Sequence, residues 1–203
     1  MNPQNTETEK TSDHNAGNRT VVDFHGQPLE FRIVGPDDAT ILGDYFVSLS
    51  TETRRRYGPH AFDRETAEQL CATTDPGETL RMIAVDRTAA TPRIIAYFIL
   101  ILGVRDDDVV RYQILGIPLN AAQDCTLAPS VADDYQSKGL GSVLMRRLVE
   151  IAREIGRTRM VLWGGTQATN DRAVHFYHKH GFTTVGEFQE PPGFNNYDMI
   201  LDL

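Results

Sequence analysis

Apolar residues recur at helical spacing along the second half of this chain. Five of them follow one another at steps of three and four, which places them on one face of a helix that ends near Gly156. These five are Leu140, Leu144, Leu148, Ile151 and Ile155. A short β-rich run, Cys125–Val131, comes before this helix. The pattern therefore predicts a strand, a glycine-containing turn and a long amphipathic helix.

Other segments alternate or cluster in ways that predict further elements. The expected strands are Leu29–Val34, Leu80–Val85, Ile94–Gly103, Met160–Trp163, Phe182–Phe188 and Tyr197–Leu203. The expected helices are Pro36–Ser50, Arg64–Ala72 and a segment that Thr169 or Asn170 caps and Gly181 ends. Thr53–His60 is interpreted as a basic turn and Asp106–Asp108 as a solvated loop. Many strands mixed with helices indicate an α+β or α/β sandwich rather than a barrel.

The turn after Cys125–Val131 has the chemistry of an anion site. Gln136-Ser137-Lys138-Gly139-Leu140-Gly141 joins a strand to a helix, where the first backbone N–H groups have no partner within the helix and point outward from the positive end of its dipole. Gly139 and Gly141 lack a Cβ, so a pyrophosphate can approach the main chain. The turn therefore predicts a phosphorylated cofactor.

The spacing of the glycines excludes one nucleotide loop and weakens another. A Walker loop needs Gly-x-x-x-x-Gly-Lys-Ser/Thr, which is absent. A dinucleotide fingerprint needs a third glycine three residues after Gly141, where Leu144 stands. The only support for a nicotinamide oxidoreductase would be the pair Gly139-x-Gly141.

Two motifs together resemble the Gcn5-related N-acetyltransferase superfamily. The first is Gln136-x-x-Gly139-x-Gly141, and the second is Asn170-x-x-Ala173-x-x-x-Tyr177, which ends in Gly181-Phe182. The resemblance implies a mixed, mostly antiparallel central sheet flanked by helices, with a splayed central strand pair. It also implies transfer of an acetyl group from acetyl-CoA to a primary amine by direct attack, without a metal.

The resemblance also implies roles for individual residues. Tyr177 is expected to protonate the leaving thiolate, since a thiolate with a pKa of about 8.5 leaves more easily beside a proton donor. The residues expected to bind coenzyme A are Ala128, Ser130, Val131, Gln136, Ser137, Lys138, Gly139, Leu140, Gly141, Ser142, Asn170 and Tyr177. The backbone of Ala128–Val131 is expected to polarise the thioester carbonyl.

Several alternatives stay open at this point. Pro129 fits either a splayed strand or an edge strand. Asp124 and Glu78 are candidate general bases, and Asp124 lies near the start of the central strand. Arg54–Arg56 are interpreted as surface charge, although they could meet an acidic group of the acceptor. A non-catalytic acyl-CoA sensor on the same fold is the alternative function. Three helix histidines, His175, His178 and His180, lack the carboxylate or cysteine of a convincing metal set.

Composition sets the remaining expectations. The chain has 203 residues, 40% of them hydrophobic, and a net charge of −8. We expect a disordered polar tail over residues 1–21 and one acetyltransferase domain over residues 22–203. Cys71 and Cys125 show no metal or disulfide spacing, which favours the cytoplasm. The acidity argues against nucleic acid and anionic membranes and mildly favours a cationic or amine-bearing acceptor, with a small-molecule amine slightly favoured over a protein lysine or N-terminus. Tyr197–Leu203 could pair across a homodimer.

Overall fold

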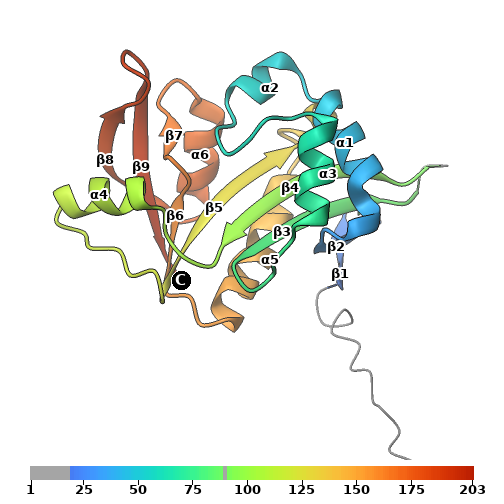
Figure 1. The fold of residues 1–203 in the computed structure, drawn as a ribbon, viewed down its shortest axis with the longest axis horizontal. Helices are drawn as coiled ribbons and strands as arrows, with labels where there is room; N and C mark the ends of the chain where they lie inside the picture. Colours follow the sequence, from blue (N-terminus) through green and yellow to red (C-terminus); the bar gives the residue numbers. More distant parts are fainter. Residues whose placement is uncertain (1–18, 89–90) are drawn as a thin grey trace, which may run out of the picture.

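The computed structural model describes residues 19–88 and 91–203, whose strands form a single nine-stranded sheet (Figure 1). The strands are β1 (Arg19–Phe24), β2 (Gln27–Ile33), β3 (Thr79–Asp86), β4 (Arg93–Ile101), β5 (Asp124–Val131), β6 (Arg159–Leu162), β7 (Thr166–Gln167), β8 (Thr183–Gln189) and β9 (Asn195–Asp202). The order is β1-β2-β3-β4-β5-β6-β9-β7, and β8 pairs with β9. Every neighbouring pair is antiparallel except β5 and β6. This confirms the mixed, mostly antiparallel sheet.

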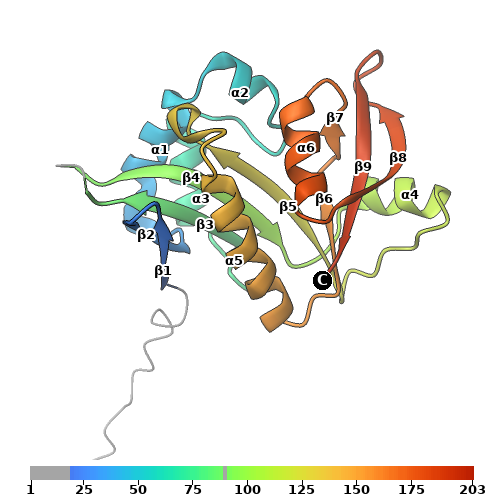
Figure 2. The same cartoon turned by 180° about the vertical axis from the view of Figure 1, so that it is seen from behind.

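Helices cover both faces of the sheet. They are α1 (Ala39–Ser48), α2 (Thr51–Arg55), α3 (Arg64–Ala72), α4 (Asp106–Ile114), α5 (Leu140–Glu154) and α6 (Asp171–Lys179), with short 3-10 turns η2 (Pro36–Asp38) and η3 (Asp133–Tyr135). Helices α1 and α3 lie in front of the sheet in Figure 1, whereas α5 lies in front in the reversed view of Figure 2. None of these helices has the length and apolar character needed to cross a membrane.

Two apolar layers follow from this arrangement. On the α5 and α6 face, Leu140, Leu144 and Leu148 are fully buried, as their spacing predicts. The stripe ends earlier than predicted, since Ile155 is 42% exposed. On the opposite face, α1 and α3 pack Phe46 and other apolar residues against β3 and β4. Burial of these faces is the main favourable contribution to folding.

Helix α4 was not predicted, and it replaces the expected solvated loop at Asp106–Asp108. The three acidic residues form the first turn of the helix, where their negative charges interact favourably with the positive end of the helix dipole. Asp108 is 1% exposed, because it pairs with Arg111 one turn later. Tyr112 packs on β6 and β9 and donates a hydrogen bond to the carbonyl of Met199. The local sequence of this segment is polar and therefore predicted a loop. The helix is held in place by residues of β6 and β9, which are distant in the sequence.

The amino-terminal boundary also differs from the prediction. The expected tail over residues 1–21 overlaps β1, which begins at Arg19 and pairs with β2, so the expected domain start at residue 22 falls inside a strand. Residues 1–18 lie outside the described residues. The predicted first strand, Leu29–Val34, is β2 and begins two residues earlier. Thr53–His60 begins inside helix α2 rather than in a turn.

The central strands separate partway along their length. β5 pairs with β4 as far as Val131, but its parallel pairing with β6 ends at Leu127. The N–H of Trp163 donates to the carbonyl of Leu127 (2.9 Å), and the chain then turns away through Gly164 and Gly165. Both glycines have positive φ, at 62° and 68°. A Cβ on Gly165 would lie 2.6 Å from the carbonyl oxygen of Tyr197 on β9. The turn is therefore seated directly against the backbone of β9.

We expect the two glycines of this turn to differ in their tolerance of a side chain. Gly165→Ala should lower the free energy of unfolding by about 3 kcal/mol, because strain at positive φ adds to a clash with backbone. Gly164→Ala is the matched control: its φ is also positive, but its Cβ would meet nothing within 4 Å. It should lose about 1 kcal/mol. Urea unfolding measures both, and equal losses would contradict close seating on β9.

Candidate functional site

Strand β5 presents an unpaired backbone edge where it leaves β6. The N–H of Ala132 donates to Ile95 on β4 (2.9 Å), so by alternation Ala128 and Ser130 also direct their peptide groups to β4. Pro129 and Val131 therefore direct theirs to the gap. Proline removes an N–H that would have no strand partner there, which explains how Pro129 is tolerated in a central strand. The splayed interpretation of Pro129 is the one that the structure supports.

The turn after β5 is held open by side-chain contacts. The Gln136 amide donates to the carbonyl of Val131 (2.9 Å) and to the Thr53 hydroxyl (3.1 Å). Ser137 has a φ of 58° and Gly139, the N-cap of α5, a φ of 94°. Left-handed residues so close together are uncommon and turn successive N–H groups toward one side. The N–H of Ser142, expected to bind phosphate, instead donates to the carbonyl of Gly139 (3.0 Å).

Asp133 joins this turn to helix α2 on the other side of the gap. Its carboxylate accepts hydrogen bonds from the N–H of Ser50 (2.7 Å) and the hydroxyl of Thr53 (2.5 Å). Burial would raise the pKa of Asp133, but the bonds from Thr53 and Ser50 outweigh it and hold the pKa below its ordinary value. A stable carboxylate therefore fixes α2 beside the turn.

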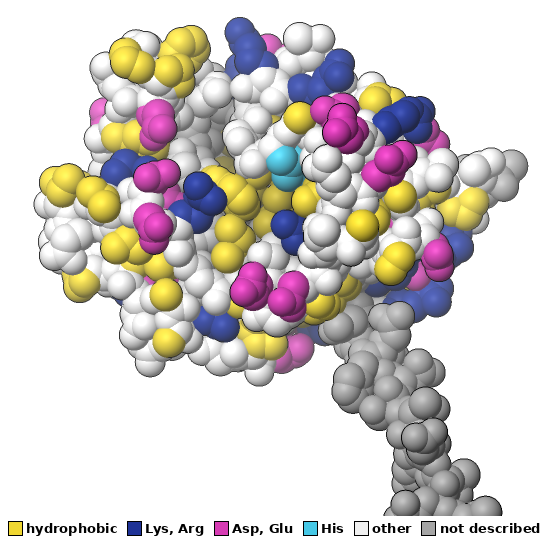
Figure 3. All heavy atoms as spheres, viewed as in Figure 1, with side chains coloured by type: hydrophobic (Ala, Val, Ile, Leu, Met, Phe, Trp, Pro, Cys, Tyr) yellow, Lys and Arg dark blue, Asp and Glu magenta, His cyan; other side chains and the backbone are white. Residues whose placement is uncertain are grey.

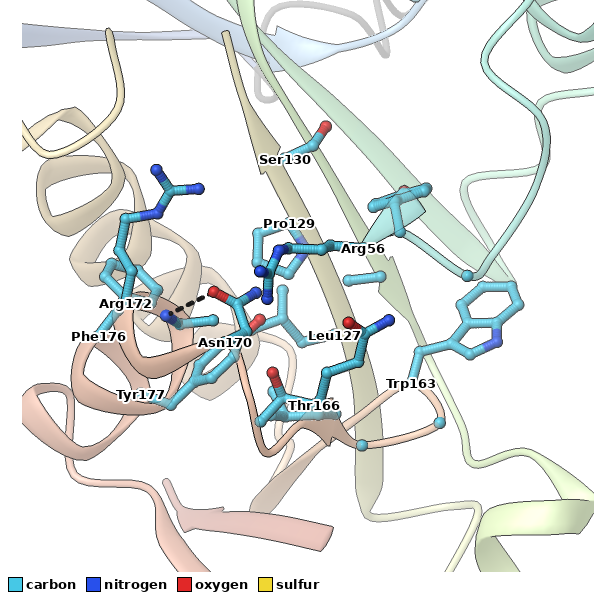
Figure 4. Close-up of a pocket in the computed structure, with 18 of the residues that line it drawn as sticks. Arg56, Leu127, Pro129, Ser130, Trp163, Thr166, Asn170, Arg172, Phe176 and Tyr177 are labelled. Carbon is cyan, nitrogen blue, oxygen red and sulfur yellow. Dashed lines mark hydrogen bonds between the residues drawn. The ribbon is translucent and has the colours of Figure 1, made fainter. Parts of the chain in front are cut away.

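Tyr177 lies on α6 and reaches the gap from the α5 side (Figure 4). Asn170 caps this helix by accepting a hydrogen bond from the N–H of Ala173 (3.3 Å). The Tyr177 ring packs edge-on against Phe176 and Phe182, at 5.4 Å from each, and the residue is 8% exposed. Burial raises the pKa of Tyr177 above its ordinary value. The hydroxyl therefore keeps its proton.

These parts line one cavity of about 810 Å³. Figure 3 shows a hollow on this face of the molecule, with hydrophobic side chains inside it and Lys and Arg side chains around it. Most of the predicted cofactor residues line the cavity: Ala128, Ser130, Val131, Gln136, Ser137, Gly139, Gly141, Ser142, Asn170 and Tyr177. Its volume is in the range of small-molecule sites.

Three predicted residues lie away from the cavity lining. Lys138 is exposed, and its carbonyl contacts the imidazole of His25 (3.2 Å). Leu140 is fully buried in the core. Asp124 is also fully buried and lies at the start of β5, where Arg159 holds its carboxylate (2.6 Å). Because Asp124 pairs with Arg159 and does not line the cavity, we do not propose it as the general base. Glu78, the other candidate, does not line the cavity either.

The opposite wall contains Trp163, which the sequence did not single out, and Arg56, one of the three arginines that could meet an acidic group of the acceptor. Trp163 follows β6, and the guanidinium of Arg105 lies over its ring at 4.5 Å. Arg56 follows α2, pairs with Glu52 (2.6 Å) and points toward Pro129 in Figure 4. Their signal in the sequence was weak, because Arg56 belongs to a run of three arginines and Trp163 ends an ordinary strand pattern.

A buried charge cluster forms a further part of the wall. Arg111 pairs with Asp108 and with Asp198 on β9 (3.1 Å), and Asp108 and Arg111 both line the cavity. Burial raises the pKa of Asp108, and the Arg111 charge offsets this only in part. Asp108 Oδ2 has no hydrogen-bond partner in the described part of the chain.

The three helix histidines have separate surroundings. His178 Nδ1 contacts the carbonyl of Phe182 (3.1 Å), His180 Nε2 contacts the hydroxyl of Ser142 (3.0 Å), and His175 lines the cavity. Among residues 19–88 and 91–203, no three His, Cys, Asp or Glu side chains form a group that could hold a metal ion.

Comparisons with known proteins agree with this geometry. The model of the acetyltransferase (GNAT) family matches residues 128–182, which run from the unpaired half of β5 through α6. The L-amino acid N-acyltransferase MnaT of Escherichia coli (strain K12) is 34% identical over 73 residues. That match covers 36% of this chain and 40% of MnaT, so the chain aligns with less than half of this relative.

Solved structures match over nearly the whole chain. The GNAT domain of S. lividans PAT has a TM-score of 0.66 at 18% identity, covering 91% of this chain and 96% of that one. Ribosomal-protein-S5-alanine acetyltransferase from Vibrio fischeri has a TM-score of 0.66 at 14% identity, covering 90% and 96%. At these identities the likeness shows the fold. Taken together, the family match over residues 128–182, the curated relative and the fold support the assignment of this chain to the Gcn5-related N-acetyltransferase superfamily.

Proposed function

We propose that this protein is an N-acetyltransferase that moves an acetyl group from acetyl-CoA to the primary amine of a small molecule. One observation carries the proposal: the unpaired edge of β5, the left-handed turn at Gly139 and the hydroxyl of Tyr177 meet in one cavity. These are the parts needed for an extended pantetheine arm, a pyrophosphate and a leaving thiolate.

The residues present fit acetyl-CoA as a substrate. The carbonyl of Pro129 and the N–H of Val131 face the gap, where they can bond an extended chain as a neighbouring strand would. The N–H groups of Gly139, Leu140 and Gly141 precede the first bonds within α5 and suit a pyrophosphate. A Cβ on Gly139 would meet nothing within 4 Å, so this side of the turn is open to a ligand.

The proposed reaction needs no covalent enzyme intermediate. The neutral amine attacks the thioester carbonyl carbon, and the N–H of Val131 stabilises the developing oxyanion. The carbon–sulfur bond then breaks, Tyr177 gives its proton to the leaving sulfur, and the nitrogen loses a proton as the amide forms. Asp108, a buried carboxylate with a raised pKa on the cavity wall, is our candidate for the group that takes the amine proton.

A small acceptor is favoured because the related MnaT is named for L-amino acids. Structural neighbours include both the ribosomal-protein-S5-alanine enzyme and a spermidine N-acetyltransferase chimera, SpeG from Vibrio cholerae with hSSAT (TM-score 0.60, 17% identity, covering 86% of this chain and 95% of that one). The fold alone therefore does not identify the acceptor, because neighbours named for different acceptors share it.

Acetyl-CoA binding should depend on the backbone at Gly139. Acetyl-CoA at a hundred times its dissociation constant should add about 2.7 kcal/mol to stability, seen as a rise in the unfolding midpoint, whereas NAD(H) should add nothing. Gly139→Ala should weaken acetyl-CoA binding by about tenfold or more, because a methyl group then covers the anion site. Gly156→Ala is the matched control, since Gly156 also has a positive φ and open space around it.

Both variants should lose about 1 kcal/mol of stability from left-handed strain. Only Gly139→Ala should lose affinity. Equal affinity in the two variants would mean that the pyrophosphate does not bind at this turn.

Tyr177→Phe should separate an enzyme from a sensor. The ring packing against Phe176 and Phe182 is retained, so the variant should fold and bind acetyl-CoA with unchanged affinity. Loss of the proton donor should lower kcat by about 10²- to 10⁴-fold. Wild-type turnover in the variant would refute Tyr177 as the acid. Binding without turnover in the wild type, across a panel of amines, would favour the acyl-CoA sensor.

The pH dependence of kcat gives a second test of Tyr177. Because burial raises its pKa, the hydroxyl stays protonated where an exposed tyrosine, with a pKa of about 10, begins to ionise. We expect no loss of kcat from Tyr177 ionisation between about pH 8 and pH 10. A decline over that interval that disappears in Tyr177→Phe would contradict a buried donor.

A further inference from the structure

Buried polar atoms without partners gather beside the cavity, on the α1 and α3 face of the sheet. Eight such side-chain atoms occur in the described part of the chain, and five belong to one group. The five are Arg56 Nη1, Tyr57 Oη, His60 Nε2, Arg81 Nε and Tyr97 Oη, and we call these residues the arginine–tyrosine cluster. Partnerless buried groups are rare in native proteins, so such a concentration calls for a physical reason.

The cluster joins the loop after α2 to strands β3 and β4. The rings of Tyr57 and Tyr97 lie 5.4 and 5.7 Å from the ring of His60. Tyr97 pairs with Ile83 on β3, two residues from Arg81 and on the same face. Burial raises the pKa of Tyr57 and Tyr97 and lowers that of His60, and the positive charge of Arg81 opposes the rise at both tyrosines and adds to the fall at His60.

The cluster holds two guanidinium groups, and the one carboxylate that pairs with it in the described part of the chain is Glu52, at Arg56. Arg81 makes no ion pair with any residue in 19–88 or 91–203. Glu52 is shared between Arg55 and Arg56, and Asp63 is occupied as the cap of α3 through the N–H of Thr66. A guanidinium that is partly withdrawn from water is costly unless an anion or ordered water completes it.

The donors of this cluster suit an anion with two oxygens. Arg56 and Arg81 present guanidinium N–H groups, and the two tyrosines present protonated hydroxyls. His60 Nδ1 lies 2.8 Å from the carbonyl of Ala61 and donates to it, so in the neutral ring Nε2 is an acceptor that can orient a tyrosine hydroxyl. Donors therefore predominate, which favours a carboxylate over an ammonium group.

The arginine–tyrosine cluster and the proposed acetyl-CoA site reach the cavity from opposite faces of the sheet. Arg56 and Tyr57 line the cavity, and Arg56 points into it beside Pro129 (Figure 4). The Gly139 turn and Tyr177 reach the same cavity from the α5 and α6 face. An acceptor that enters from the cluster side therefore meets the thioester across the gap in the sheet.

We infer that the arginine–tyrosine cluster binds a carboxylate group of the acceptor, which makes the substrate an amine that also carries an acid, such as an amino acid. The inference rests on the proposed function. Arg56 and Tyr57 contact the carboxylate at the cavity wall, and Arg81 supplies charge behind them. The amine end of the same molecule is then directed toward the gap beside β5.

Matched acceptors test the cluster directly. The twenty protein L-amino acids are each compared with their carboxamides, which keep the amine and lose the negative charge. For the preferred side chain, the wild type should use the acid at least about tenfold better in kcat/KM than the amide, since hydrogen bonds to charged groups are among the stronger ones. In the presence of CoA, the acid but not the amide should raise the unfolding midpoint, which gives a readout without turnover.

Variants assign the preference to named residues. Arg81→Gln and Arg56→Gln should each raise KM for the acid about tenfold or more and leave KM for the amide within about twofold. Tyr57→Phe, which keeps the ring against Phe62 at 4.4 Å, should have a smaller effect in the same direction and tests the site even if an arginine variant folds poorly. Arg64→Gln is the control, since Arg64 lies 57% exposed on α3 and pairs with Asp44.

The outcomes separate the two proposals. Equal use of acids and amides, with that ratio unchanged in the variants, would overturn the carboxylate site and leave water as the occupant of the cluster. An acid preference that the cluster variants leave intact would place the carboxylate elsewhere and overturn the inference. Failure of acetyl-CoA to bind, together with no turnover of any amine, would overturn the proposed function itself and the inference with it.

Discussion

The functional part of this fold depends on the limited pairing of β5 with β6. The two parallel strands bond only between Asp124 and Leu127, which is half of β5. Beyond that point β6 has ended, and the chain turns through Gly165, seated against the carbonyl of Tyr197, into β7, which pairs with β9. Every backbone polar group in an unpaired strand needs another partner. The sheet therefore leaves backbone N–H and C=O groups of β5 without strand partners, at a place where a ligand can bond them.

The sequence of β5 keeps the number of unpaired backbone groups small. Pro129 has no N–H to leave unpaired, and the amide of Gln136 bonds the carbonyl of Val131. What remains toward the gap is one acceptor at Pro129 and one donor at Val131. Gln136 also bonds Thr53, and Asp133 bonds Ser50, so the turn before α5 and the wall beside α2 are fixed to each other. A shift of either wall would disturb both, which keeps the two halves of the cavity in register.

The amount that the sequence predicted differs between the two halves of the site. The Gln136–Gly141 turn, the cap at Asn170 and Tyr177 lie in contiguous segments whose spacing made them predictable, and all three line one cavity. Helix α4 was missed because the burial of Asp108 depends on Arg111 and on Asp198, which is 90 residues away in the chain. Strand β1 was missed because its polar residues gain their order from pairing with β2. Asp124 seemed available as a base because its partner, Arg159, lies 35 residues further on.

Charge shows most clearly why local environment outweighs composition. A net charge of −8 mildly favoured a cationic acceptor, yet the cavity wall beside α2 carries Arg56. Surface carboxylates act through water and salt over short distances, whereas a partly buried guanidinium acts on its neighbours with little screening. The few charges inside the cavity therefore decide which ligand is favoured there, and the many outside it mainly affect solubility. Because the partnerless atoms of the arginine–tyrosine cluster are mostly hydrogen-bond donors, we propose an acid as their ligand.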